Sequence, residues 1–363
     1  TSKLIYNFAP ESNLTDEEKT NNPNVSASIL LLGGGAGGAR PACNYHSNRG
    51  SGGAGGVWNH MSDQLGGGGG AGAMGEATNY NLPMNKLITS TIGGGGGPNG
   101  NGGNSTLVID GTTVATAYGG SWNHRISGQN LGSGAGARGA SYNDAGGNCG
   151  MRRGAVNTTS QVGNKGTNNV TTYGSFTFYA NRGGNTGSPN GNDVNLTSGS
   201  GGGGGAGGYG GDRRIIGNNR RYGGNGGVGR TWINGVTYAG GGGGLGVAGN
   251  VVHTGGGTGG SGLGGQELNN LGVLWQSWVA HFQANYHYNR YQSHYDASPA
   301  NRGSGGAGGL SNHNNHNAGS GSAGITIYAI PQSMIKNSYA WNTASNPYFL
   351  TTVKSTDNTV TTS

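Results

Sequence analysis

The feature that most restricts the fold of this chain is glycine, which supplies 85 of 363 residues and recurs in uninterrupted runs such as 66–70 and 201–205. Glycine loses more backbone entropy on ordering than any other residue, so such a chain stays disordered unless its backbones satisfy one another. Extended polyproline II segments pack closely only where side chains are missing. We therefore expect a mainly irregular and β fold: a glycine-rich polyproline II bundle with short β-hairpins and strands, joined by N–H···O and Cα–H···O contacts.

Composition excludes other classes of glycine-rich chain. Collagen is excluded because glycine is not repeated at every third position and only nine prolines are present. Charged residues make up 9% of the chain and the net charge is +7, so charge repulsion does not hold it open. No apolar run approaches the roughly 18 residues of a membrane span. The scarcity of lysine and the many Asn, Ser and Thr residues favour an extracellular or virion-surface location.

The pattern along the chain divides it into three parts. Residues 1–28 are expected to form an N-terminal attachment segment with a short strand over 4–8. Residues 29–330 form the glycine-rich bundle domain, where a buried strand expected over 27–32 runs into the first glycine run. Residues 331–363 form a C-terminal extended arm, which suits strand or arm exchange between subunits. The first residue is Thr rather than Met, which fits a processed product or part of a longer chain.

Two hairpins flanked by glycine runs are predicted from their turn residues. Asp110-Gly111 and Asn234-Gly235 each lie between β-branched residues. These dipeptides are the strongest short hairpin signal, because both central positions of a type I′ turn need a positive φ. A third strand is expected over 170–180, without such a turn, and 324–330 alternates as a closing strand.

These features resemble the glycine-rich domains of bacteriophage tail-fibre and adhesin proteins. The resemblance lies in the passage from strand to glycine at 29–38, the two glycine-flanked hairpins and the closing residues 319–328, and it covers roughly residues 29–330. It implies polyproline II bundles that present variable loops to a host receptor. Similar bundles in animal receptor ectodomains and in an antifreeze protein differ from this chain in cysteine content or in length.

A tripeptide of Trp, Asn and His occurs twice, at 58–60 and 122–124. A Trp face stacks on the C–H groups of a sugar ring while Asn and His bond its hydroxyls, which makes the pair a candidate receptor or glycan site. The alternative is an architectural repeat in which Trp shields an edge of the bundle. The candidate residues are Trp58, Asn59, His60, Trp122, Asn123 and His124.

Residues 266–296 break the pattern, because glycine almost vanishes and aromatic residues concentrate. Their three- and four-residue spacing predicts an amphipathic helical insertion, interrupted at Gly272. As an exposed tip it would offer rigid aromatic contact area to a receptor. As an alternative it forms a subunit interface or an internal helix that covers the glycine bundle. The candidate residues are Trp275, Trp278, Tyr286, His287, Tyr288, Tyr291 and Tyr295.

Metal, cofactor and nucleic-acid sites are not expected. The pair His313 and His316 and the histidines of the insertion lack acidic or cysteine ligands nearby. For the basic pairs 213–214 and 220–221 nucleic acid is conceivable, but the charge is spread over a long chain, so a lipopolysaccharide phosphate or an acidic glycan is as good a target. More often such pairs belong to a solvated loop. The two cysteines, Cys43 and Cys149, leave one bridge or two free thiols equally open.

Asn-X-Ser/Thr sequons are frequent, although the abundance of these residue types generates several by chance. In a eukaryotic host they would be glycosylation candidates. The sequon residues are Asn13, Asn24, Asn104, Asn157, Asn169 and Asn195.

An enzyme is not expected, because glutamate is scarce, Asp144 and Asp212 stand in glycine loops with no second acidic residue close in sequence, and no nucleophile elbow is present. The first hypothesis is an extracellular or virion-surface structural adhesin whose loops bind a cell-surface glycan or an outer-membrane receptor. The alternative is a self-assembling filament or coat subunit that packs against copies of itself or other virion and fibre proteins. An ice-binding protein is a distant third.

Overall fold

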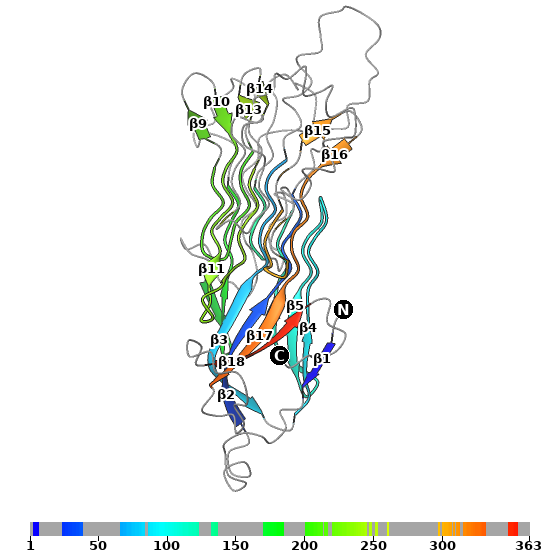
Figure 1. Cartoon of the computed structure of the whole chain (residues 1–363), viewed down its shortest axis with the longest axis vertical. Helices are drawn as coiled ribbons and strands as arrows, with labels where there is room; N and C mark the ends of the chain where they lie inside the picture. Colours follow the sequence, from blue (N-terminus) through cyan, green and yellow to red (C-terminus); the bar gives the residue numbers. More distant parts are fainter. Residues whose placement is uncertain are drawn as a thin grey trace, which may run out of the picture.

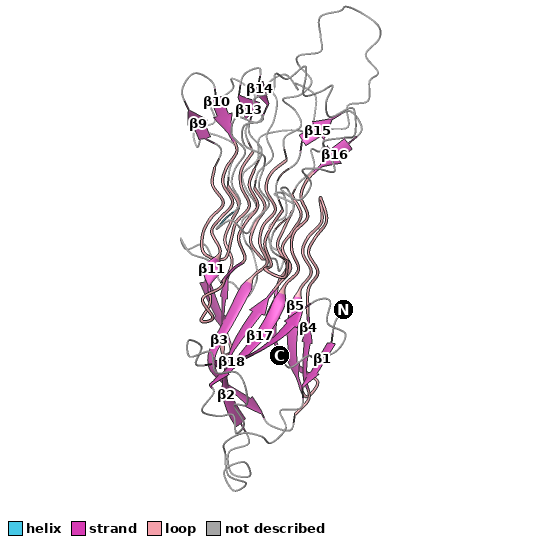
Figure 2. Ribbon diagram, in the orientation of Figure 1, coloured by secondary structure: helices cyan, strands magenta, loops and turns pink. Residues whose placement is uncertain are grey.

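The computed structural model forms a rod with β-sheets at one end, short hairpins at the other and glycine-rich segments between them (Figures 1 and 2). Among the residues described, no α-helix occurs, and antiparallel β-strands and irregular extended segments dominate. The fold is therefore mainly β and irregular, as expected. The residues described are 3–6, 24–38, 66–83, 86–122, 132–136, 170–184, 200–212, 214–216, 220–244, 247–248, 251–252, 260, 297, 300–306, 308, 310–312, 315–331 and 348–354.

The largest sheet has six antiparallel strands in the order β18-β17-β2-β3-β8-β7. The expected buried strand before the first glycine run is β2, and the expected closing strand is β17. The strands are β2 (Asn24–Leu32), β3 (Met74–Pro83), β7 (Val170–Tyr173), β8 (Phe176–Tyr179), β17 (Ile325–Pro331) and β18 (Tyr348–Lys354).

A second sheet of four strands packs on one face of the first, in the order β1-β4-β5-β6. The expected N-terminal strand over 4–8 is found slightly earlier, as β1, and pairs with β4. The strands are β1 (Lys3–Tyr6), β4 (Ile88–Thr91), β5 (Ser105–Ile109) and β6 (Thr112–Ala117).

The six-stranded sheet is buried on both faces, which explains the unbroken apolar run at the end of β2. Ile29 and Leu31 point into the core shared with the four-stranded sheet. Leu30 and Leu32 point to the other face, where Trp232 and other residues around the short hairpin of β11 (Arg230–Thr231) and β12 (Thr237–Tyr238) cover them. A strand covered on both sides reads as continuously hydrophobic rather than alternating.

The opposite end of the rod, which we call the distal end, carries the remaining strands (Figure 1). They form a small antiparallel sheet in the order β14-β13-β10-β9 and a separate hairpin of β15 and β16. Each hairpin belongs to a connection between two glycine segments. The strands are β9 (Arg214–Ile216), β10 (Arg220–Tyr222), β13 (Val247–Ala248), β14 (Val251–Val252), β15 (Leu310–Asn312) and β16 (Asn315–Asn317).

Both predicted hairpins form, but only one has the predicted turn. Asp110 and Gly111 have φ of 50° and 78°, as a type I′ turn between β5 and β6 requires. In the β11–β12 hairpin Gly235 has φ 75° while Asn234 has no positive φ, and the Gly235 N–H donates to the carbonyl of Trp232. This is a three-residue loop of a type I turn followed by a left-handed glycine.

The prediction of one strand without a turn over 170–180 was wrong. β7 and β8 form a third hairpin, in which Tyr173 pairs with Phe176 across Gly174 and Ser175. Gly174 has φ 56° in the first central position, where the tight two-residue II′ turn places its glycine. The Gly-Ser dipeptide is the sequence signal for this turn.

The glycine segments are joined by backbone hydrogen bonds that repeat every three residues. Segment 33–38 donates its N–H groups to three neighbours in turn, and acceptor numbers fall as donor numbers rise, so all three neighbours run antiparallel to it. The donor and acceptor pairs are Gly33 to Ala73, Ala36 to Gly70, Gly34 to Gly103, Gly37 to Gly100, Gly35 to Ser322 and Gly38 to Gly319, at N···O distances of 2.8 to 3.0 Å.

Three segments lie at the centre of this arrangement, because each is hydrogen-bonded to six neighbouring segments. Segment 33–38 is surrounded by 66–73, 93–99, 100–103, 118–122, 303–306 and 318–324. Segment 66–73 is surrounded by 33–38, 118–122, 132–136, 200–206, 239–244 and 303–306. Segment 200–206 is surrounded by 66–73, 132–136, 181–184, 207–212, 223–229 and 239–244.

Close backbone approach explains why these central positions are glycine. A Cβ on Gly34 would collide with the backbone carbonyl of Gly94, and a Cβ on Gly203 would collide with that of Gly69. Neither collision can be relieved by rotating a side chain, because the obstacle is backbone. The central segments therefore tolerate little beyond glycine.

The remaining domain expectations are only partly covered. The predicted helical insertion, 266–296, lies outside the described residues. Within the C-terminal arm, β18 pairs with β17 along seven residues of register, from Ile325 opposite Lys354 to Pro331 opposite Tyr348. The structure therefore places this part of the arm on its own chain's sheet.

Candidate functional site

The distal end is where the chain's connections gather, because successive glycine segments leave and re-enter the bundle there. Segment 33–38 runs away from β2, and segment 66–73 returns toward β3, so connection 39–65 begins and ends on the distal side. The same holds for 213–222, which contains β9 and β10, and for 309–317, which contains β15 and β16 (Figure 1). A recognition surface built from these three connections would therefore lie at the distal end.

The predicted aromatic sites fall mostly outside the described residues. Trp58, Asn59 and His60 belong to connection 39–65, and Asn123 and His124 directly follow a described segment. All candidates of the insertion, from Trp275 to Tyr295, belong to 261–296, as do its histidines. The structure does not bring the two Trp-Asn-His tripeptides together within the part that it describes.

Trp122 is the one described member of these candidates. It is half-buried at the end of segment 118–122, and its backbone N–H donates to Oδ1 of Asn101 at 3.1 Å. Its position on an outer segment of the bundle is the one that the architectural alternative requires. Its use as a sugar platform stays a prediction.

Asparagine side chains on the outer segments replace missing backbone partners. Asn104 accepts a hydrogen bond from the N–H of Gly119 at 2.9 Å. Asn101, which precedes Asn104 by three residues, accepts a hydrogen bond from the N–H of Trp122, which follows Gly119 by three residues. The two bonds repeat the three-residue spacing of the bundle on its surface. This role was not predicted from the sequence, in which the Asn-X-X-Asn spacing is the signal for it.

Two of the sequon residues are described. Asn104 is exposed, and its hydrogen bond uses Oδ1 rather than the amide nitrogen to which a sugar would be attached. Asn24 is half-buried at the start of β2, opposite Pro83. Asn13, Asn157, Asn169 and Asn195 lie outside the described residues, as do Cys43 and Cys149.

Three of the four arginines of the basic pairs lie on one distal hairpin. β9 and β10 pair with Arg214 opposite Tyr222 and Arg221 opposite Ile215, which brings arginines from both sides of the turn onto one two-stranded element. The hairpin continues into β13 of the same small sheet. The backbone of this hairpin therefore places these arginines at the distal end.

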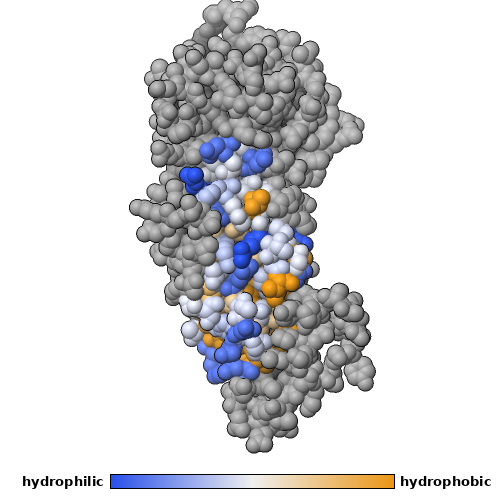
Figure 3. Space-filling model, turned by 90° about the vertical axis from the view of Figure 1, so that its left-hand side faces the viewer, coloured by the Kyte–Doolittle hydropathy of each residue, from blue (hydrophilic) through white to orange (hydrophobic). Residues whose placement is uncertain are grey.

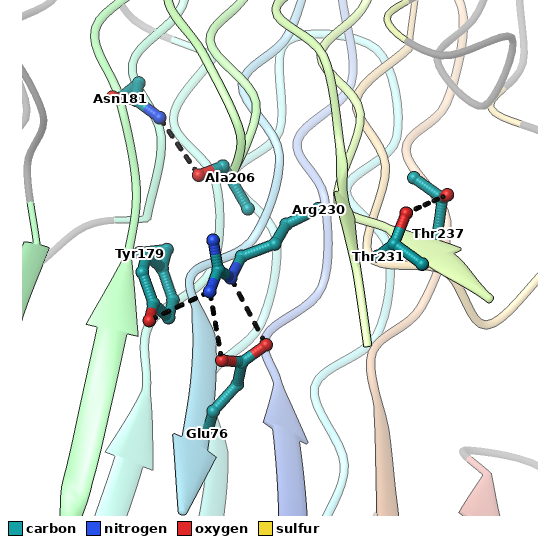
Figure 4. A network of polar contacts seen from close by, with 7 residues as sticks. All are labelled: Glu76, Tyr179, Asn181, Ala206, Arg230, Thr231 and Thr237. Carbon is teal, nitrogen blue, oxygen red and sulfur yellow. Dashed lines mark hydrogen bonds and ion pairs between the residues drawn. The ribbon is translucent and has the colours of Figure 1, made fainter. Parts of the chain in front are cut away.

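A polar network joins the β11–β12 hairpin to the six-stranded sheet (Figure 4). Arg230 of β11 donates to the carboxylate of Glu76 on β3, with Nε 3.3 Å from Oε1, and also to the hydroxyl of Tyr179 on β8 at 3.1 Å. The guanidinium lies 3.8 Å from the centre of the Tyr179 ring. Burial raises the pKa of the Tyr179 hydroxyl, and the Arg230 charge opposes the rise.

Two further arginines stack on tyrosines and link segments that are distant in sequence. Arg302 lies 4.8 Å from the centre of the Tyr238 ring, and Arg182 lies 5.1 Å from that of Tyr209. Burial raises the pKa of Tyr238, against its hydrogen bond from Asn234 and the charge of Arg302. Cation–π contacts of this kind contribute about 0.5–1 kcal/mol where exposed. These contacts therefore stabilise the packing of segments that are distant in sequence.

The lateral face around the hairpin is mixed in character. Figure 3 shows its described part as hydrophilic or neutral, interrupted by separate hydrophobic patches. The large apolar side chains most exposed near the hairpin are Val228, at 51%, and Ile233, at 45%. Isolated residues of this kind are ordinary on a protein surface and do not by themselves define a binding site.

The described residues contain neither a cluster of His, Cys, Asp or Glu side chains that could hold a metal ion nor a helix long and apolar enough to cross a membrane. Comparison of the chain with protein-family models, with curated proteins and with solved structures returns no match.

Proposed function

We propose that the chain is an extracellular or virion-surface structural adhesin, in which a rigid bundle of polyproline II helices presents the connections at its distal end to a cell-surface receptor or glycan. The observation that carries the proposal is the three-residue repeat of hydrogen bonds between glycine segments, together with the gathering of connections at one end. The first supports a stiff scaffold, and the second gives that scaffold a presenting surface.

The three-residue repeat supports the polyproline II assignment. A polyproline II helix has three residues per turn and no internal hydrogen bonds, so its N–H groups point outward in three directions. Segment 33–38 donates in three directions at this spacing, and its carbonyls accept from three other segments. A β-strand, with side groups alternating every two residues, would offer two directions instead.

Such a bundle separates support from recognition. Its central positions admit little beyond glycine, so they cannot carry aromatic, basic or amide groups for a ligand. The connections bear no such restriction, since loops tolerate sequence change far better than the framework that they join. A rigid scaffold with free connections is the arrangement that a binding protein with variable loops needs.

The residues of the connections favour a sugar ligand with acidic groups. Trp58, Asn59 and His60 in connection 39–65 offer a stacking ring and hydrogen-bonding groups. The arginines of the β9–β10 hairpin offer positive charge at the same end of the rod. An acidic cell-surface glycan would satisfy both kinds of group.

The test replaces connection 39–65 by a short turn. The chain contains a suitable template: segments 93–97 and 100–103 are joined by Pro98 and Asn99, where the Gly100 N–H donates to the Gly97 carbonyl at 2.7 Å and Asn99 has φ 61°. Because 33–38 and 66–73 are also antiparallel neighbours, a Pro-Asn turn can join them. A second variant removes 266–296, and a third carries Trp58→Ala alone.

For an adhesin, at least one shortened variant keeps the thermal unfolding temperature of the full chain but no longer binds to cells or to an array of acidic glycans. Full binding by all three variants would refute the assignment of recognition to these connections. If the full chain binds no cell or glycan but forms open-ended polymers that removal of 266–296 dissolves, the filament alternative replaces the adhesin.

A further inference from the structure

Glycine segment 93–99 lies at an edge of the bundle and has an exposed side that the described part of the chain leaves uncovered. This segment is hydrogen-bonded to 33–38, 100–103 and 318–324, whereas a central segment has six bonded neighbours. Gly94, Gly95 and Gly97 are exposed on its free side. Half of the positions around this segment are therefore open within the part of the chain that the structure describes.

Within the described part of the chain, neither backbone conformation nor close packing requires glycine at two positions of this segment. Among the described glycines, a Cβ would meet open space at Gly111, Gly174 and Gly235, but their positive φ explains the residue. A Cβ would also meet open space at Gly94 and Gly97, where the backbone has no positive φ. An ordinary side chain would fit at both positions and would cost less entropy on folding.

The free side of 93–99 has the same pattern of backbone groups as the side of segment 33–38 to which 93–99 is bound. On the inner segment, the Cα atoms of Gly34 and Gly37 face the backbone of Gly94 and Gly97, and the Gly35 carbonyl accepts from the N–H of Gly96 at 2.8 Å. On the free side, Gly94 and Gly97 take the place of Gly34 and Gly37. The Gly95 carbonyl, which takes the place of that of Gly35, accepts from no described backbone N–H group.

We propose that this edge, formed by Gly94, Gly95 and Gly97, binds a glycine segment from a second copy of the chain. The occupant must be extended with a three-residue repeat, must bring its backbone against two Cα atoms three residues apart, and must donate N–H groups. The chain's own glycine segments have this chemistry, as their packing on 33–38 demonstrates. This inference rests on the proposed polyproline II bundle but does not depend on receptor binding.

The direction of the hydrogen bonds defines the kind of assembly. Every contact of segment 33–38 with a neighbour is bonded in one direction, with one partner donating and the other accepting. Two identical edges related by a two-fold axis would place like groups opposite each other. We therefore expect a heterologous contact, which gives rings or filaments rather than a closed dimer.

The test is the double substitution Gly94→Ala and Gly97→Ala in the full chain, with Thr113→Ala, at an exposed position of β6, as the control. Sedimentation velocity over a hundred-fold range of protein concentration measures assembly, and thermal unfolding at the lowest concentration measures folding. We expect the parent and the Thr113 variant to form species larger than dimers as concentration rises. The double variant should stay monomeric with an equal or higher unfolding temperature.

Each other result overturns the proposal. A parent chain that stays monomeric, a parent that stops at a two-fold dimer, or a double variant that assembles like the parent would exclude the contact as described. A double variant that unfolds at a clearly lower temperature would show that a segment of the same chain covers the edge. Because cell or glycan binding is measured separately, failure of this contact and failure of the adhesin function are distinguishable.

Discussion

Single residues complete the hydrogen bonding of the bundle where backbone partners run out. In the interior every glycine segment finds other backbones around it, but an outer segment faces solvent on one side. Asn101 and Asn104 extend a carbonyl oxygen to N–H groups on segment 118–122, at the spacing of the bundle itself. Asparagine is suited to this task because its short side chain ends in a group equivalent to a peptide.

Asn104→Ala should therefore destabilise the fold by about 0.5–1.5 kcal/mol, the usual net value of one hydrogen bond, with the lower part of the range favoured by partial exposure. Asn104→Asp keeps the acceptor and is the matched control. Urea denaturation of both variants measures the free energy of unfolding. Equal loss in the two variants would mean that the Gly119 N–H does not depend on this acceptor.

At the scale of the elements, the two sheets are joined by a buried pair of hydroxyls. Ser90 on β4 and Tyr328 on β17 lie 2.7 Å apart, oxygen to oxygen, across the core between the four-stranded and six-stranded sheets. Tyr328 is 1% exposed. Burial raises the pKa of the Tyr328 hydroxyl well above its ordinary value of 10.0, and the bond with Ser90 only partly offsets this effect.

Stability should consequently fall at alkaline pH. The folded state holds the Tyr328 proton more tightly than the unfolded state, so the contribution is complete below pH 10.0, the ordinary value, and is lost as pH rises toward the folded pKa. Denaturation between pH 8 and pH 11 should show a steeper decline for the parent than for Tyr328→Phe. Burial also raises the pKa of Tyr80, Tyr179 and Tyr238, so the variant should retain part of the decline. Identical pH profiles would contradict the assignment.

At the scale of the whole molecule, the sheets and the bundle form one continuous framework. β2 runs directly into 33–38, β4 into 93–99 and β6 into 118–122. Because each strand and its glycine segment are continuous, the pairing register of the strand also fixes the register of the segment in the bundle. Slippage of a central glycine segment would break its bonds to six neighbours and shift the strand that continues it. The bundle therefore gains its order from cooperation with the sheets, despite the entropy cost of glycine.

Amide hydrogen exchange should follow this framework. Amides of the central segments, such as Gly34 and Gly203, should exchange at least about 1,000-fold more slowly than free peptide, because only global opening exposes them. In dilute monomer, amides of Gly94, Gly95 and Gly97 should exchange fast, since they donate to no described backbone group. Mass-resolved exchange at low and high protein concentration measures both. Uniformly fast exchange would argue against a rigid scaffold.

Local features of the fold followed from the sequence because local chemistry decides them. Asp110-Gly111 specified a turn with two positive φ values, and the apolar run of β2 specified a buried strand. The abundance of glycine indicated that backbones must pack on one another. The Asn234-Gly235 turn was predicted as a hairpin of the wrong type, since the same dipeptide fits both a two-residue and a three-residue loop.

The candidate site followed less well, since contacts between distant segments decide it. The Trp-Asn-His tripeptides and the aromatic insertion remain predicted sites. The hydrogen bonds accepted by Asn101 and Asn104, and the ion pair of Arg230 with Glu76, became visible only in the structure. No local pattern marks Arg230 as a partner of a residue that lies 154 positions away.

The sequence by itself determined that glycine backbones must be packed, that two hairpins turn at Asp110-Gly111 and Asn234-Gly235, and that the strand before the first glycine run is buried. Only the tertiary structure decided which glycine segment neighbours which, which three lie at the centre, and which edge stays open. The physical reason is that glycine runs carry no side chains by which one neighbour could be distinguished from another. Their order is imposed by the strands that continue them and by the hydrogen bonds of the assembled bundle.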